Sequence, residues 1–139
     1  MKIYVPVLFS LFLSSSILAQ TESVDPLVSK LGALLTGVEV CGSVHDSLNA
    51  SSVNIKFPLL LVSSVELGQE KAGLMLSLLT VLTKEFNTPE FRNLFTLKKC
   101  KQVILTAERF VEVWLKKYPN RKAPEWLNPL LEEYKRLTN

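Results

Sequence analysis

The sequence predicts an all-α fold, a small bundle of four to five helices with one disulfide, Cys41–Cys100, between two of them. Three observations lead to this prediction. Apolar residues recur at helical spacing along most of the chain. The chain has two cysteines, and both fall on the apolar faces of expected helices. An apolar leader at the N-terminus predicts export to a compartment in which a disulfide persists.

Residues 1–19 have the parts of a secretory signal peptide. Lys2 supplies a positive start, an apolar run covers 3–13, and Ala19 is a small residue at the expected cleavage site. The run is shorter than the ~20 apolar residues that a membrane-spanning helix needs. We therefore expect a secreted or periplasmic protein, cleaved near Ala19, in which residues 20–139 form a single helical domain.

The first helix is expected from 26 to 48. Asp25 before Pro26 is typical of a helix start, because the carboxylate can cap the helix and proline suits its first turn. The polar stretch 49–52 is expected to end the helix. The apolar alternation in 53–57 has no second strand to pair with, so we interpret it as a connector. The expected apolar face consists of Leu27, Leu31, Leu34, Leu35, Val38, Cys41 and Leu48.

Residues 59–86 are the most apolar part of the chain. Pro58 opens this part, and a stretch with charged residues between Gly68 and Gly73 divides it. Charges in the middle argue against a membrane span. We expect two helices here, or one bent helix.

The C-terminal third contains further helix starts. Thr88-Pro89 is expected to begin a short turn, and Thr96 to cap a helix over 97–118. A proline-bounded loop that holds Trp126 then leads to a last helix over 130–137. The apolar face expected for the 97–118 helix consists of Cys100, Val103, Ile104, Ala107, Val111 and Trp114.

Cys41 and Cys100 are expected to form a disulfide, because both lie on core-facing sides of different helices in an exported chain. Closing a loop of about 60 residues contributes about 4 kcal/mol in the chain-entropy model. Two buried free thiols are the alternative.

The sequence gives few signs of catalysis, and we expect no enzyme, no cofactor and no metal site. His45 is the one histidine, and its place on an apolar helix side is typical of a packed side chain. The five glycines form no phosphate-binding pattern, and the cysteines lack the CxxC spacing of redox sites. Asn49-Ala50-Ser51 matches an N-glycosylation acceptor.

The segment 74–82 is apolar around nearly the whole circumference of a helix. Such a helix must be central in its bundle or be covered by something else. A dimer interface and a groove for a lipophilic ligand are the alternatives to a central position. In the ligand alternative, the pocket residues are Leu74, Leu78, Leu79 and Leu82.

Residues 98–139 carry ten basic and five acidic side chains, a net charge of +5. This favours a surface that binds an acidic protein, because cations speed the encounter and arginine and tryptophan anchor interfaces. A second copy of the chain and an anionic membrane are alternatives, and so are a solvated helix face and a tryptophan that only packs the last helix. Without Lys2 of the leader the chain carries 15 basic and 13 acidic residues, a net charge of +2, which gives no indication of nucleic acid binding. The candidate partner-binding residues are Lys116, Lys117, Arg121, Lys122 and Trp126.

The segment Trp114-Leu115-Lys116-Lys117-Tyr118-Pro119, followed by Pro124 and an apolar helix, resembles the C-terminal part of helical periplasmic immunity proteins of type VI secretion systems. That family also has a cysteine near its C-terminus, which this chain lacks. The resemblance implies a helical fold and a protein partner. Together with the other patterns it favours an exported protein that binds another protein, as an inhibitor, immunity factor or assembly accessory. A carrier of a small lipophilic ligand is the alternative.

Overall fold

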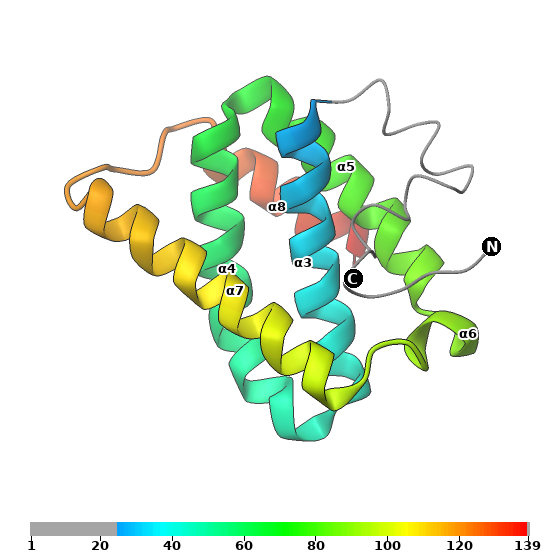
Figure 1. Ribbon diagram of the computed structural model, residues 1–139. Coiled ribbons are helices and arrows are strands. Elements are labelled where there is room, and N and C mark those ends of the chain that lie inside the picture. The colour runs from blue at the N-terminus through cyan, green and yellow to red at the C-terminus, as the bar shows by residue number, and fades with distance from the viewer. Residues whose placement is uncertain (1–24, 139) are drawn as a thin grey trace.

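The computed structural model describes residues 25–138, and the regular structure in that range is entirely helical (Figure 1). Five long helices and one single-turn helix confirm the predicted all-α bundle. The predicted signal peptide, residues 1–19, lies outside the described residues. The helices are α3 (Pro26–Val44), α4 (Asp46–Leu67), α5 (Gln69–Phe86), α6 (Pro89–Arg92), α7 (Leu97–Lys117) and α8 (Leu127–Thr138).

The central helix is α3, not the 74–82 segment of α5. Every residue from 31 to 42 except Glu39 is buried. The helix contacts α4, α5 and α7, and Figure 1 shows α7 crossing both α3 and α4. By length and composition alone α3 could cross a membrane, but 67% of its apolar stretch is buried inside the bundle. A helix that is buried on all sides in a core has the same composition.

The start of α3 is as predicted. Pro26 occupies its first turn, and the Asp25 carboxylate accepts a hydrogen bond from the Leu27 backbone N–H at 2.8 Å. Lys71 also donates to Asp25, at 2.7 Å, and this hydrogen bond lowers the pKa of the carboxyl group. The cap therefore also ties the start of α3 to α5.

The predicted end of the first helix was wrong. The helix ends at Val44, and the chain reverses at His45, whose backbone is extended. The polar stretch 49–52, which was expected to end the first helix, lies inside α4. Its polar groups are satisfied by α3, since Ser52 donates to the Val38 carbonyl at 2.8 Å and Asn49 donates to the Gly42 carbonyl at 3.3 Å.

Glycine 42 explains how the two helices approach so closely. A methyl group at Gly42 would overlap the side chain of Ser52. Serine and asparagine usually compete with helix formation by bonding to nearby backbone. Here they bond to the carbonyls of a neighbouring helix instead, which the local sequence does not reveal.

The predicted connector over 53–57 is also wrong, because this stretch is the middle of α4. Ile55 is buried, whereas the side chains of Val53 and Phe57 are 62% and 50% exposed. The alternation thus comes from a helix with two apolar sides, since residues four apart share one side. The helix continues through Pro58 and ends before Gly68, whose φ of 86° suits glycine.

The most apolar part of the chain therefore lies in two helices, with Gly68 between them. This confirms the first of the two predictions for this part, two helices and not one bent helix. In α5, Leu76, Leu79 and Leu82 are buried, but Leu74 and Val81 are 49% and 46% exposed. The helix is amphipathic, and it looks apolar on all sides because Leu74 and Val81 lie on its exposed side.

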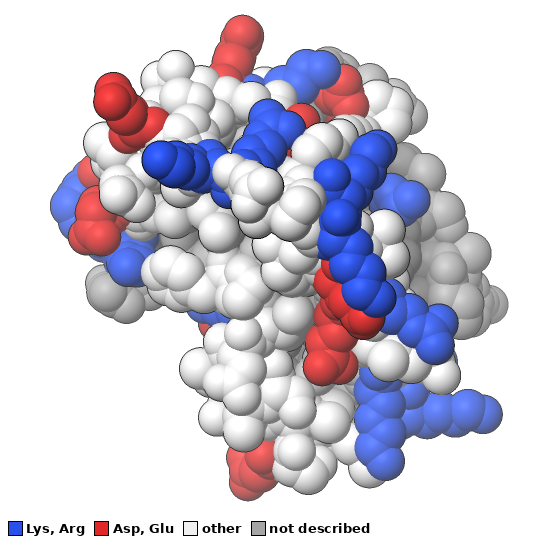
Figure 2. Space-filling view, turned by 90° about the vertical axis from the view of Figure 1, so that its left-hand side faces the viewer, with Lys and Arg blue, Asp and Glu red and all other residues white. Residues whose placement is uncertain are grey.

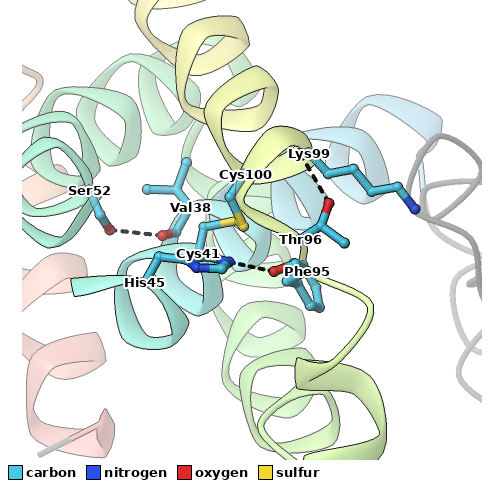
Figure 3. Close-up of a disulfide and its surroundings, with 8 residues drawn as sticks. All are labelled: Val38, Cys41, His45, Ser52, Phe95, Thr96, Lys99 and Cys100. Carbon is cyan, nitrogen blue, oxygen red and sulfur yellow. Dashed lines mark hydrogen bonds between the residues drawn. A yellow bond between two sulfur atoms is a disulfide. The ribbon is translucent and has the colours of Figure 1, made fainter. Parts of the chain in front are cut away.

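The disulfide Cys41–Cys100 joins α3 to α7, with the two Cα atoms 5.4 Å apart (Figure 3). Beside it, the His45 ring donates from Nε2 to the Phe95 carbonyl at 2.6 Å. Thr96 caps α7 by accepting from the Lys99 backbone N–H, as predicted. The six residues expected on the apolar face of α7 are all buried. These contacts fix α7 across the bundle.

Candidate protein-binding face

One side of α4 carries apolar residues that the fold leaves accessible. Val53, Phe57 and Leu61 follow one another at four-residue spacing and so share a side of the helix. Val53 and Phe57 are exposed and Leu61 is half-buried. We call these three residues the open side of α4. Contiguous exposed apolar side chains of this kind mark interaction sites more often than single ones do.

A groove of about 360 Å³ lies between the open side of α4 and α7. Its walls are entirely apolar. On the α7 side the groove ends at Leu115, which is 48% exposed. An apolar recess of this kind accepts an apolar side chain without leaving a buried polar group unpaired. The lining residues are Phe57, Pro58, Leu61, Val62, Val111 and Leu115.

A second hollow, a cleft of about 240 Å³, lies between α4 and α8. Phe57 lines both hollows and so forms the ridge between them. The ammonium group of Lys135 lies 4.6 Å from the centre of the Phe57 ring, within the range of a cation–π contact. The cleft is lined by Val53, Lys56, Phe57, Leu60, Leu131, Tyr134 and Lys135.

Tyr134 forms part of the floor of the cleft. Burial raises the pKa of its phenol to about 12, and the negative charge of Glu39 acts in the same direction. The ring is only 6% exposed. Its hydroxyl group is therefore neutral at physiological pH, and the floor of the cleft carries no negative charge.

The charged side chains that line the two hollows, among the described residues, are both lysines. Lys56 pairs with Glu39 at 2.5 Å and Lys135 pairs with Glu132 at 3.5 Å. Figure 2 views the face on the left of Figure 1 and shows an uncharged band across it, with Lys and Arg side chains and, between them, acidic ones along its right-hand edge. The charged side chains that line the hollows in the described part of the chain are thus two lysines, each held in an ion pair with a glutamate.

The predicted basic residues lie at the C-terminal end of α7 and in the following loop. Lys116 pairs with Glu112 at 2.9 Å, and this hydrogen bond raises the pKa of the lysine. The Arg121 guanidinium group lies 5.3 Å from the centre of the Tyr118 ring. Lys117 and Lys122, like Lys116 and Arg121, are exposed. Lys116 and Lys117 directly follow the groove-lining Leu115, and Arg121 and Lys122 lie in the loop after α7.

Trp126 differs from the other four predicted residues. It is half-buried and packs against the hydrophobic core. The other tryptophan has a contact that sequence reasoning missed, since Trp114 donates from Nε1 to the Glu66 carboxylate at 3.0 Å. The two residues are 48 positions apart, and no local pattern indicated that they would meet. This bond joins α7 to α4 beside the groove.

The open side of α4 is the main feature that sequence reasoning missed. Its signal was present in the four-residue spacing of Val53, Phe57 and Leu61. The signal was masked by Ile55, which made the same stretch look like an alternating strand.

The leucines of the predicted ligand pocket do not share one accessible surface. Leu79 and Leu82 are buried, Leu78 is half-buried against the core, and Leu74 is exposed. A hollow of about 70 Å³ lies between α5 and α8, and its walls are other residues, such as Gly73 and Leu130. Leu78, Leu79 and Leu82 pack the bundle.

No group of three or more His, Cys, Asp or Glu side chains in the described residues is arranged to hold a metal ion. His45 is half-buried, and its Nε2 is used by the bond to Phe95. Both cysteines are oxidised.

Fold and face together define a class: a disulfide-linked, all-α protein with an open apolar face. The chain matches no protein-family model, no curated protein and no solved structure. Its function is therefore argued from its own geometry.

Proposed function

We propose that this protein is exported and binds another protein through the open side of α4 and the two hollows beside it. The observation that carries the proposal is the groove of about 360 Å³, which has an apolar wall throughout and lies between the half-exposed side chains of Phe57 and Leu115. The folded chain leaves this apolar recess unfilled within the described residues.

The energetics of such a face suit a protein partner. Covering apolar surface contributes about 25 cal/mol per Å², and a few residues at the centre of an interface supply most of the affinity. Phe57 is the central residue here because it lines both hollows. A partner that fills both hollows would desolvate the Phe57 ring on two sides.

The partner-binding proposal includes the biological roles that the sequence suggests: an inhibitor, an immunity factor or an assembly accessory. The disulfide fits an oxidising compartment, and the leader over residues 1–19 has the composition of a signal peptide. In each of these roles the protein acts by binding and carries out no catalysis of its own.

A carrier of a small lipophilic molecule is the second candidate, and the geometry favours it less. Carriers and other ligand sites bury most of the ligand in a pocket of about 300–1,000 Å³. Here Leu79 and Leu82 pack in the core. The larger hollows lie instead on the outer side of α4, where exposed side chains form their rims.

Two valines give a matched test of the proposal. Val53 at the open side is 62% exposed, and Val113 on α7, which lines neither hollow, is 65% exposed. The mature protein and its Val53→Glu and Val113→Glu variants would be used to capture partners from the compartment in which the protein accumulates. The captured protein would then be purified and titrated against all three forms.

We expect Val53→Glu to raise the Kd by about tenfold or more, because a carboxylate would be buried at the interface. Val113→Glu should leave the Kd within about twofold, since surface substitutions away from an interface have small effects. A captured protein that binds both variants as tightly as the wild type would place the interface elsewhere.

A further inference from the structure

The two hollows, the ridge between them and the cations around them also indicate what kind of segment binds there. We infer that the partner presents an amphipathic α-helix with acidic side chains next to its apolar ones. This inference rests on the proposed function and adds the chemistry of the partner.

The shape of the face suits a helix. The open side of α4 extends from Val53 to Leu61, about 12 Å at 1.5 Å per residue. This length matches two turns of a partner helix, whose apolar side chains at positions i, i+4 and i+7 would project on one side. With Phe57 as the ridge, one such side chain can enter the α4–α7 groove and the next can enter the α4–α8 cleft.

The charges select an acidic helix. Lys56 and Lys135 line the cleft, and no acidic residue lines either hollow among the described residues. In the residues that follow Leu115 along the chain, the exposed cations Lys117, Arg121 and Lys122 have no carboxylate paired with them in the described part of the chain, and Arg121 lies 5.8 Å from the ring centre of Trp114, the neighbour of Leu115. Carboxylates on the partner would meet Lys117, Arg121 and Lys122, which speeds association and fixes the orientation of the helix.

The same charges argue against two other occupants. A second copy of this chain, packed face to face, would bring the Lys117, Arg121 and Lys122 side chains of two identical surfaces together, and like charges at an interface are unfavourable. An anionic membrane would satisfy the cations. A flat bilayer surface would leave the recess between Phe57 and Leu115 unfilled, however, whereas a protruding side chain fills it.

Site-specific cross-linking reads the chemistry of the occupant directly. The photoreactive amino acid p-benzoyl-L-phenylalanine would replace Leu115, at the rim of the groove, and in a control variant Val113, two residues away on the same helix. After irradiation in the producing cells, the adducts would be digested and sequenced by mass spectrometry.

We expect position 115, but not position 113, to form an adduct with a peptide that has apolar residues at helical spacing and more Asp and Glu than Lys and Arg. A basic peptide at position 115 would overturn the inference but leave the proposed function intact. A copy of this chain or a lipid at that position would also overturn the inference. Equal yields at both positions, or none at 115, would count against the proposed function itself.

Charge reversal gives a second, independent readout on the purified complex. Reversing Lys117, Arg121 and Lys122 to glutamate should lower the association rate by about tenfold at low salt and flatten its salt dependence. The control reverses the same number of cations, Lys98, Lys99 and Lys101, at the other end of α7. Equal slowing in both variants, or none in the first, would contradict an acidic partner at the groove.

Discussion

The two sides of α4 are both apolar, yet the fold uses them in different ways. One side faces α3, where Ser52 donates to the Val38 carbonyl and Leu59 is completely buried. The other side, with Val53 and Phe57 at its centre, is half or more exposed and borders two hollows. Because α4 packs fully on one side and not on the other, its second apolar side is left for a partner. The predictions below separate the two sides by what each contributes.

The largest effect on stability should come from the disulfide, which joins α7 to α3. The double substitution of Cys41 and Cys100 by alanine should lower the free energy of unfolding by about 4 kcal/mol, because the bond closes a long loop in the unfolded chain. Urea denaturation measures this loss. A loss below about 1 kcal/mol would show that packing alone holds α7 in place.

The two sides of α4 differ most simply in Leu59 and Leu61. Leu59→Ala should cost about 2–5 kcal/mol, since it leaves a cavity against α3. Leu61→Ala should cost well under half as much, because Leu61 is half-buried beside the open groove. Denaturant midpoints of the two variants test this order, and equal midpoints would contradict the distinction between the sides.

A substitution at Gly42 tests the close approach of α3 and α4. Gly42→Ala should lower the free energy of unfolding by about 1–3 kcal/mol, because the new methyl group overlaps the Ser52 side chain. The double variant Gly42→Ala, Ser52→Gly removes the overlap and should recover part of the loss. The Ser52→Gly single variant is the reference. If the double variant is less stable than the summed losses of Gly42→Ala and Ser52→Gly predict, α3 and α4 do not meet as described.

A smaller effect concerns pH and the cleft on the open side. The folded protein holds the Tyr134 phenol in its neutral form, with a pKa of about 12, whereas the unfolded chain ionises near pH 10.0. The unfolded state therefore loses its proton first, and stability falls as pH rises through this interval. Tyr134→Phe should remove this component. Thermal melts of both proteins between pH 9 and pH 12 would show parallel curves if Tyr134 is not buried as described.

The smallest effect on stability is expected at the open side itself. Val53→Glu and Val113→Glu both replace exposed valines, so each should change the free energy of unfolding by about 0.5 kcal/mol or less. Chemical denaturation of the two variants checks this. A large loss for Val53→Glu alone would mean that the open side contributes to folding, and a binding defect in that variant would then need another explanation.

The sequence predicted the parts of the fold that depend on local signals. Asp25-Pro26 and Thr96 mark helix starts at the right residues, and the spacing of Cys100, Val103 and Ile104 identified the buried face of α7. The two cysteines predicted the disulfide because both lie on core-facing positions.

The boundary between α3 and α4 could not be predicted, because what stabilises it is not local. Ser52 and Asn49 look like helix-ending residues until the carbonyls of Val38 and Gly42 are placed beside them. The central role of α3 was missed as well, because it depends on close contacts that the local sequence does not show, such as those of Gly32 with Leu78 and of Gly37 with Val103. Of the candidate site, the sequence located the basic end of α7, but the groove exists only where α4 and α7 meet.

The most direct test of the account is a methyl NMR titration of the labelled protein with its purified partner. The account predicts that binding shifts the methyl signals of Val53, Leu61 and Leu115, which border the two hollows. The signals of Leu74 and Val113, which are also exposed but lie outside the hollows, should stay in place. Shifts at Leu74 and Val113 with unchanged signals from the open side of α4 would contradict it.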